Sequence, residues 1–285
     1  MTLAPIIKLI GSKQRQRKNI LPIIERYSRL LYVEPFGGAG GMLFGKAPEK
    51  QEIYNDINGA FVSLFRAVKN PETMSTVQTL LDLSPMSREL WREARDLAVA
   101  YLRGDDLTEL KARAELGAYS DEIAVAYAIF YAQNCGFGGT FLNAYGGGGK
   151  REGSSKIAHL YNEKRHRLPR YCRRLQTVAI ENLDALDCVR KYDDATTLFY
   201  LDPPYATGSD EYGVAFHERA LVDLLKTIKG AFVLSCYDTP IYAELTEICD
   251  KYEFDAYSSV SQYAKKGERF ARKEIVYATR VASLF

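Results

Sequence analysis

Two kinds of hydrophobic pattern divide the chain. Short runs rich in apolar, β-branched and aromatic residues predict six strands, at Leu30–Glu34, Glu52–Asn55, Thr177–Ile180, Thr197–Leu201, Ala231–Ser235 and Glu274–Thr279. Amphipathic runs that come after some of these strands predict three helices, at Ala60–Val68, Glu218–Lys229 and Ile241–Cys249. The alternation predicts an α/β fold with a largely parallel sheet. Sheets of this kind bind their ligands at the carboxyl ends of the strands.

The middle of the chain has a different texture. Between Pro71 and about Tyr171 the pattern predicts long helices, around Ser87–Tyr101 and Asp121–Asn134, and no parallel strand. We therefore predict one α/β domain from residues 1–70 and 172–285, and a mainly helical inserted domain from residues 71–171.

The inserted region contains a glycine-rich loop from Gly136 to Gly149. Its last four residues are consecutive glycines, which cannot hold a regular helix, so the segment is flexible when free. A plain linker is one explanation of this composition. The interleaved aromatic residues Phe137, Phe141 and Tyr145 favour the other, a loop that becomes ordered on a partner.

Composition places the chain among globular proteins. It has 285 residues, of which 47% are hydrophobic and 26% are charged, and this excludes disordered and low-complexity classes. The longest nearly apolar run, Ile123 to Ala132, is too short to span a membrane, and Lys8 interrupts the apolar N-terminus before a signal sequence forms. We expect a cytoplasmic protein with no membrane partner.

Cysteine and histidine are too dispersed to form a metal site. The five cysteines contain no CxxC pair, which predicts reduced core residues instead of disulfides or a zinc site. His159, His166 and His217 are far apart in the sequence. We therefore expect no metal.

Charge is informative through its distribution. The formal net charge is only +2, but residues 1–30 carry seven basic groups against one acidic group, and residues 150–174 carry nine against two. Residues 88–122 carry six against nine. The basic clusters fit either a solvated helix face or contacts to phosphates.

The strongest chemical motif is Asp202-Pro203-Pro204-Tyr205, directly after the predicted strand at Thr197–Leu201. Two prolines lack N–H groups and stiffen the backbone, so they fix the Asp202 carboxylate relative to the Pro203 carbonyl. These two acceptors suit an exocyclic amine of a nucleobase. The lone pair of such an amine is delocalised into the ring, and acceptors that hold its two N–H bonds favour a tetrahedral nitrogen. Tyr205 would stack on the base. A simple turn is the other interpretation.

A second motif follows the first predicted strand. Glu34-Pro35-Phe36-Gly37-Gly38-Ala39-Gly40-Gly41 is a glycine-rich turn that allows close approach of a ligand, although it is not GxGxxG. Asp56 ends the next predicted strand, 16 residues after Gly40, where an acid commonly binds ribose hydroxyls.

In order and spacing these motifs resemble the Dam-like DNA adenine N6-methyltransferases, which use S-adenosylmethionine. Ile7–Lys13 resembles the family's N-terminal motif, Glu34–Gly41 its methionine-side glycine motif, Asp56 its ribose acid and Asp202–Tyr205 its catalytic motif; Leu234–Pro240 and Arg272–Tyr277 resemble its late strands. The resemblance implies a Rossmann-like methyltransferase sheet, with residues 71–171 as the target-recognition domain.

The resemblance also implies the roles of individual residues. Catalytic roles fall to Asp202, Pro203, Pro204 and Tyr205. Cofactor contacts are expected from Lys8, Lys13, Glu34, Pro35, Phe36, Gly37, Gly38, Gly40, Asp56, Asn58, Leu183, Asp184 and Asp202. DNA contacts are expected from Lys13, Arg15, Phe137, Thr140, Phe141, Asn143, Arg165, Arg167 and Arg170. The expected reaction is methylation of adenine N6 in a specific double-stranded DNA sequence after base flipping, as in restriction–modification.

Some features depart from the family pattern. Leu9 replaces an aromatic residue and Ser12 replaces a glycine in the N-terminal motif, so cofactor contacts differ there. The recognition loop lacks the arginine of relatives that methylate GATC, which argues against a GATC target. Cytosine-N4 methylation, a catalytically silent DNA-binding relative and an RNA substrate stay open as alternatives. Cytosine-C5 methylation is excluded because the chain has no Pro-Cys dipeptide.

Overall fold

The computed structural model describes residues 2–9, 11–27, 29–137, 142, 144–147, 153–204, 217–258 and 270–280. The chain divides into two compact units. The helical unit consists of Met1–Ser12, Gly38–Pro48 and Asp56–Asn182, and the sheet unit of Lys13–Gly37, Glu49–Asn55 and Leu183–Phe285. Each unit is described by itself below.

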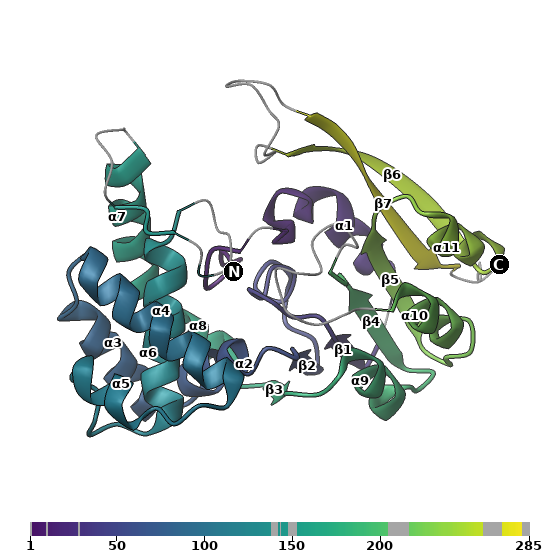
Figure 1. Ribbon diagram of the computed structural model, residues 1–285. Helices are drawn as coiled ribbons and strands as arrows, with labels where there is room; N and C mark the ends of the chain where they lie inside the picture. The colour runs from purple at the N-terminus through teal and green to yellow at the C-terminus, as the bar shows by residue number, and fades with distance from the viewer. Residues whose placement is uncertain are drawn as a thin grey trace. The chain divides into compact units, whose positions relative to one another are not determined.

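The sheet unit is built on strands in the order β2-β1-β4-β5-β7-β6 (Figure 1). Their bounds are β1 (Leu31–Glu34), β2 (Gln51–Asn55), β4 (Thr197–Leu201), β5 (Ala231–Cys236), β6 (Cys249–Ser258) and β7 (Phe270–Thr279). The pairs β1–β2, β1–β4 and β4–β5 are parallel. β7 is antiparallel to both β5 and β6. The carboxyl ends of β1, β2 and β4 therefore lie along one edge of the sheet, where Glu34, Asn55 and Leu201 are the last strand residues.

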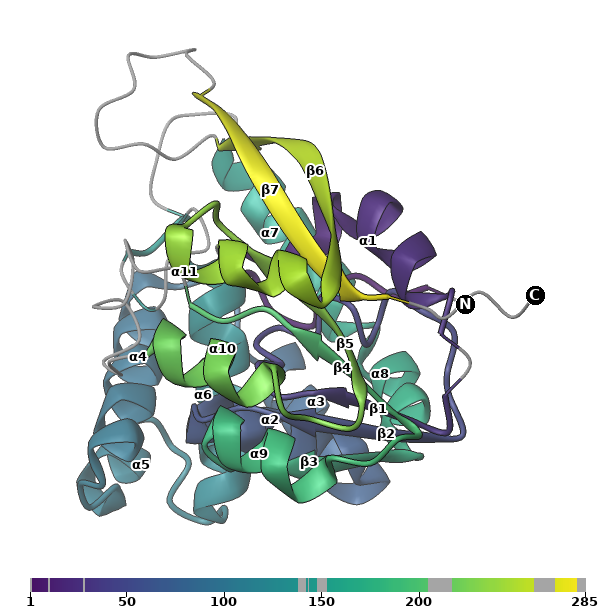
Figure 2. The same ribbon diagram turned by 90° about the vertical axis from the view of Figure 1, so that its right-hand side faces the viewer.

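The period of two residues along each strand separates the two faces of this sheet. One face is apolar: Phe199 and Leu201 of β4 pack with residues of β5 and β7, and the layer is covered by α9 (Ala185–Tyr192), α10 (Glu218–Leu225) and α11 (Pro240–Ala243). Figure 2 shows these three helices in front of the strands. The intervening residues, among them Ser235 and Glu274, are also buried but point to the other face. That face is the one that carries polar groups.

Two short elements precede β1 in the sheet unit. They are the 3-10 helix η1 (Lys13–Arg15) and the helix α1 (Arg17–Ile24), which buries Ile20, Ile23 and Ile24. A second 3-10 helix, η3 (Glu244–Glu247), directly follows α11.

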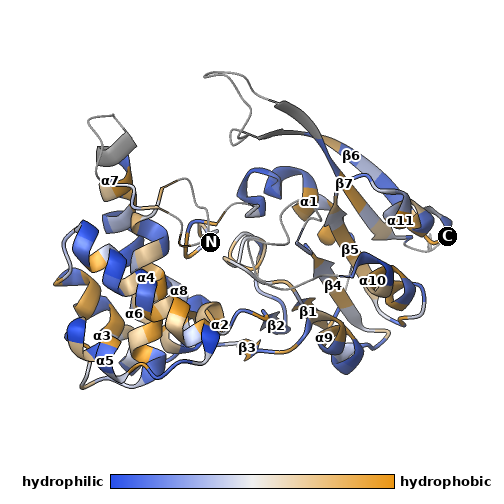
Figure 3. Cartoon of the chain, viewed as in Figure 1, coloured by the Kyte–Doolittle hydropathy of each residue, from blue (hydrophilic) through white to orange (hydrophobic). Residues whose placement is uncertain are grey.

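The helical unit is organised around one buried helix. Its elements are α2 (Gly59–Lys69), α3 (Pro71–Asp82), α4 (Arg88–Arg103), α5 (Thr108–Arg113), α6 (Asp121–Cys135), α7 (Gly153–Arg165), α8 (Leu168–Leu175) and the strand β3 (Val178–Glu181). Every residue of α6 from Ala124 to Cys135 is buried, and α2, α3, α4 and α7 pack around it. The apolar run at Ile123–Ala132 is thus the core of this unit (Figure 3).

Polar side chains define where these helices begin. Asn58, Asn70, Ser87 and Ser120 accept hydrogen bonds from backbone N–H groups of the first turns of α2, α3, α4 and α6. Such caps satisfy donors that have no partner inside the helix. Gly104 ends α4 in the left-handed conformation, with φ of 77°.

The predicted α/β, Rossmann-like class is confirmed. All six predicted strands are present to within a few residues, and the five cysteines are buried and free as predicted. The prediction of one helix over Ile241–Cys249 is wrong, because α11 gives way to η3 and Cys249 begins β6. The sequence pattern also missed β6, whose residues alternate charged and aromatic side chains at an antiparallel edge. The recognition domain at residues 71–171 stays a prediction.

Candidate active site

The motif that follows β4 begins at the end of a fully buried strand. All five residues of β4 are buried, and Asp202 comes next with a side chain that is 19% exposed. Pro203 is buried and Pro204 is partly buried. Tyr205 lies outside the described residues. The strand thus holds the Asp202 carboxylate at the carboxyl edge of the sheet, within reach of solvent.

Asp202 is part of a buried charge cluster. Its Oδ1 lies 3.2 Å from Lys13 Nζ, and Lys13 Nζ lies 2.9 Å from Glu274 Oε1. Lys13 is 5% exposed and Glu274 is 6% exposed. Burial opposes the charge of Lys13, but the neighbouring carboxylates of Asp202 and Glu274 outweigh it and raise the lysine's pKa above its ordinary value. The lysine is therefore a fixed cation between two carboxylates.

A second polar pair lies at the end of β1. The hydroxyl of Tyr32 donates a hydrogen bond of 2.7 Å to Oε1 of Glu34, and both residues are buried. Burial and the Glu34 charge raise the pKa of Tyr32 well above its usual value. Tyr32 is thus a permanent neutral donor that fixes Glu34, the first residue of the glycine motif.

Asn55 organises the edge of the sheet unit, and the motif analysis missed it. Its amide donates to the Pro35 carbonyl at 2.8 Å and to the Leu183 carbonyl at 3.1 Å, and its Oδ1 accepts the Leu183 N–H at 2.8 Å. Gly37 N–H donates to the Asn55 carbonyl at 2.8 Å. An asparagine at the end of the predicted strand Glu52–Asn55 was the signal available in the sequence.

Gly37 has no room for a side chain. A Cβ atom there would come within 2.2 Å of the Tyr54 ring. In the helical unit, Gly40 has φ of 70°, and a Cβ atom would lie 2.6 Å from the Phe44 ring. The glycines of this turn are therefore required by packing and by backbone conformation as well as by any ligand.

Asp56, in the helical unit, is held by backbone donors. Its Oδ2 accepts the Gly38 N–H at 2.7 Å and its Oδ1 accepts the Asn58 N–H at 2.8 Å. Burial raises the pKa of Asp56 to about 6, against the effect of these two hydrogen bonds. Each oxygen keeps a second lone pair, and the residue is partly exposed, so the carboxylate fits the two hydroxyls of a ribose.

Three other predicted cofactor residues make hydrogen bonds to the backbone that stabilise the fold. Asn58 caps α2 and Asp184 caps α9 through their side-chain oxygens. Lys8 Nζ donates to the carbonyl of Asn134 at 2.6 Å. Burial lowers the pKa of Lys8, against the influence of Cys135. Cofactor contacts from these residues stay predictions, as do those from Pro35, Phe36 and Leu183.

The predicted DNA-binding arginines differ in how they are held. Arg165 donates to the Leu81 carbonyl at 2.8 Å at the end of α3 and lies over the ring of Tyr161. Arg167 pairs with Glu163 one turn earlier. Arg170 is partly buried, and Arg15 is exposed in η1. Arg165 therefore stabilises the helical unit whether or not it meets DNA.

Only part of the predicted recognition loop can be placed. Phe137 is 65% exposed, and its N–H donates to the Ala144 carbonyl at 2.7 Å. An isolated antiparallel bridge joins Gly136 to Tyr145. Thr140, Phe141 and Asn143 lie outside the described residues. The ends of the loop are thus tied together at the carboxyl end of α6.

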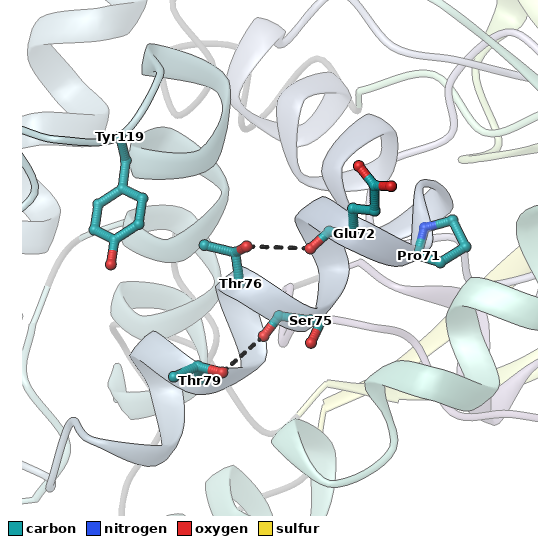
Figure 4. A pocket seen from close by; sticks show the side chains of 6 residues that line it. All are labelled: Pro71, Glu72, Ser75, Thr76, Thr79 and Tyr119. Carbon is teal, nitrogen blue, oxygen red and sulfur yellow. Dashed lines mark hydrogen bonds between the residues drawn. The ribbon is translucent and has the colours of Figure 1, made fainter.

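A hollow of about 640 Å³ lies along α3 and contains none of the predicted site residues. Figure 4 shows its lining, which is Pro71, Glu72, Ser75, Thr76, Thr79 and Tyr119. The Thr76 and Thr79 hydroxyls donate to carbonyls of their own helix, at 3.1 and 3.0 Å, so they do not converge on a ligand. Among the described residues, no group of three or more His, Cys, Asp or Glu side chains could hold a metal ion, and no helix is long and apolar enough to cross a membrane.

The Asp-Pro-Pro motif at the carboxyl edge of an α/β sheet is compatible with the amine chemistry that the sequence predicts. The family model of the D12 class N6 adenine-specific DNA methyltransferases matches residues 9–266. The chain belongs to this family, which confirms the predicted family, enzyme class and DNA adenine substrate.

A curated relative agrees with this assignment. The chain is 28% identical over 213 residues to the type II methyltransferase M.MjaIII of Methanocaldococcus jannaschii. The match covers 72% of this chain and 70% of that protein. The roles of individual residues are not tested by either comparison and stay predictions.

Proposed function

We propose that this enzyme transfers the methyl group of S-adenosylmethionine to N6 of adenine within a specific sequence of double-stranded DNA. The observation that carries the proposal is the Asp202 carboxylate, which is partly exposed at the end of a buried strand and anchored by Lys13. Family membership supplies the reaction class, and this carboxylate supplies the group that acts on the amine.

The chemistry needs two acceptors for one amine. When bound, S-adenosylmethionine would supply an electrophilic sulfonium methyl group to N6, and S-adenosylhomocysteine would be the leaving group. In the proposed mechanism the Asp202 carboxylate and the Pro203 carbonyl accept hydrogen bonds from the two N–H groups of N6. These hydrogen bonds free the nitrogen lone pair from the ring. Positive charge develops on N6 and is offset by the carboxylate until the nitrogen loses a proton to the solvent that reaches the partly exposed Asp202. This is catalysis by positioning and electrostatic preorganisation.

The cofactor's ribose is assigned to Asp56. The Asp56 carboxylate accepts hydrogen bonds from the Gly38 N–H and the Asn58 N–H. Its remaining lone pairs would accept hydrogen bonds from the two ribose hydroxyls. Hydrogen bonds to charged groups of this kind are worth about 1.5–3 kcal/mol each. Glu34, fixed by Tyr32, is the acid proposed for cofactor binding in the sheet unit.

The target adenine must leave the duplex to reach Asp202. A base inside the stack hides its exocyclic amine, and extrusion costs a few kcal/mol. The basic residues of the N-terminal segment and of α7 and α8 would offset part of this cost through contacts to phosphates. Base flipping and the recognition domain are parts of the same proposal.

One experiment tests the reaction and the target together. DNA from cells that express this chain is sequenced by a method that detects N6-methyladenine in its sequence context, beside DNA from cells expressing Asp202→Ala. We expect N6-methyladenine at one motif in the first sample alone. N4-methylcytosine, or no methylation in DNA containing every short motif, would overturn the proposal.

A further inference from the structure

Glu274 is a buried acid to which the proposed mechanism gives no task. It lies on β7 and is 6% exposed, and its Oε1 accepts from Lys13 Nζ at 2.9 Å and from the hydroxyl of Ser235 on β5. Because β5 and β7 are paired in fixed register, with Ser235 opposite Val276, the Glu274 carboxylate is anchored by the sheet itself. It therefore differs from the mobile ion pairs of a protein surface.

The charges of this cluster do not cancel. Lys13 contributes one positive charge, and Asp202 and Glu274 contribute one negative charge each, so the three groups together carry one net negative charge. A Lys13–Asp202 pair alone would be neutral, and the ammonium would compete with the substrate for the Asp202 carboxylate. Methyl transfer places positive charge on the nitrogen that this carboxylate contacts, and a net negative cluster stabilises that charge.

We propose that Glu274 is a positioning residue for methyl transfer: it shares the Lys13 ammonium and so prevents that ammonium from fully neutralising the Asp202 carboxylate, which stays oriented toward the target amine. The inference rests on the proposed function of Asp202. Glu274 acts through Lys13 and does not touch the substrate. Ser235 fixes Glu274 in turn, so the sheet, through β5 and β7, sets the position of a residue at the end of β4.

The competing explanation is a purely structural ion pair. Buried pairs are costly to break from one side whatever their role, so a loss of stability alone does not distinguish the two explanations. A positioning role predicts a fall in kcat at unchanged affinity for cofactor and DNA, because the cluster acts on charge that exists only in the transition state. A structural role predicts that activity follows the folded fraction.

The test compares three full-length variants. Glu274→Gln removes the charge and keeps the size, and Glu274→Asp restores the charge. Glu253→Gln is the matched control, because Glu253 is on the adjacent strand β6, also pairs with lysines, Lys251 and Lys273, but is 42% exposed. Single-turnover methylation of DNA, cofactor and DNA dissociation constants and thermal unfolding are measured for each.

We expect Glu274→Gln to lower the single-turnover rate by about tenfold or more, because Lys13 then neutralises the Asp202 carboxylate that faces the developing charge. Both dissociation constants should stay within twofold of the wild type, Glu274→Asp should recover part of the rate, and Glu253→Gln should be unaffected. A rate within twofold of the wild type for Glu274→Gln, or a loss that the folded fraction accounts for, would overturn the proposal.

A crystal structure of Glu274→Gln gives a readout that is independent of catalysis. We expect Lys13 Nζ to leave its shared position and move closer to Asp202 than 3.2 Å, because one of its two carboxylates is gone. If Lys13 keeps both of its present distances, the inference is wrong even if adenine is methylated. If the wild-type protein methylates no adenine, the proposed function fails, and this structure still decides whether Glu274 shares the lysine.

Discussion

Two lysines, the buried Lys13 of the sheet unit and the partly buried Lys164 of the helical unit, have opposite electrostatic surroundings. Lys13 in the sheet unit lies between the carboxylates of Asp202 and Glu274, which overcome burial and raise its pKa. Lys164 in the helical unit is desolvated by burial and repelled by Lys8, and these effects lower its pKa to about 7, against a weaker influence of Glu163. The neighbours, and not burial itself, decide whether a buried lysine keeps its charge.

The surroundings of the two lysines suit two different ligands, the target amine and the phosphates of DNA. The Lys13 cluster has one net negative charge and suits a substrate on which positive charge develops. Lys8 and Lys164 repel each other, and they come from the two basic segments, residues 1–30 and 150–174, for which phosphate contacts are one of two interpretations. Breaking one of these clusters should therefore affect catalysis, and breaking the other should affect DNA binding.

The largest effect is expected at the acidic cluster. Asp202→Ala removes an acceptor of the target amine and should lower the single-turnover methylation rate by about a thousandfold or more. The S-adenosylmethionine dissociation constant, measured by calorimetry, should change little. Asp187→Ala, at an exposed acid that pairs with Arg190, is the control. A comparable rate for Asp202→Ala would refute the assigned mechanism.

The next largest effect is expected on the stability of variants at the two lysines, Lys13 and Lys164. Lys13→Met leaves the buried Glu274 and the partly exposed Asp202 without their shared cation and should lower the free energy of unfolding by about 3–5 kcal/mol in urea titrations at pH 7. Lys164→Met removes a cation that its surroundings disfavour, so stability should be unchanged or higher. Equal losses for both variants would contradict the comparison.

Asp56 extends the comparison to a buried acid. Its pKa is raised to about 6 by burial, so the carboxylate takes up a proton as the pH falls through 6, and this protonation favours the folded protein. Ribose hydroxyls need the charged form as acceptor. Affinity for S-adenosylmethionine should therefore fall below pH 6, by up to tenfold per pH unit.

The matched variants are Asp56→Ala and Asp56→Asn. Asp56→Ala should weaken cofactor binding by about 1.5–3 kcal/mol for each lost hydrogen bond, and Asp56→Asn should abolish the pH dependence near 6. Calorimetry from pH 5 to 8 measures both. Unchanged affinity in Asp56→Ala would move the ribose site elsewhere, with Glu34 as the next candidate.

The smallest effect is expected at Lys164. A phosphate contact requires the protonated amine, so DNA affinity should fall modestly as the pH rises through about 7. In Lys164→Met this dependence should vanish, and the slope of log affinity against log salt should decrease by about 0.9, equally for target and non-target duplexes. An unaltered slope would place Lys164 outside the DNA interface.

Much of the sheet unit was predictable because its determinants are local. Parallel strands buried on both faces have continuous apolar runs, and all six predicted strands exist. The edge strand β6 alternates polar and aromatic residues, and the helix expected over Ile241–Cys249 ends as α11 and η3 at Glu247, because Cys249 pairs with β7 instead. Amphipathic periodicity cannot report a partner strand that comes later in the chain.

The motifs Glu34–Gly41, Asp56 and Asp202–Pro204 by themselves determined the enzyme family and the residues that contact substrate and cofactor in our proposal, because a reactive group and its rigid backbone are encoded within a few residues. Only the tertiary structure decided that Lys13 serves Asp202 and that Glu274, 72 residues further along the chain, holds that lysine. It also decided that Asn55 joins the ends of two loops. Electrostatic coupling depends on distance in space, which sequence separation does not reveal.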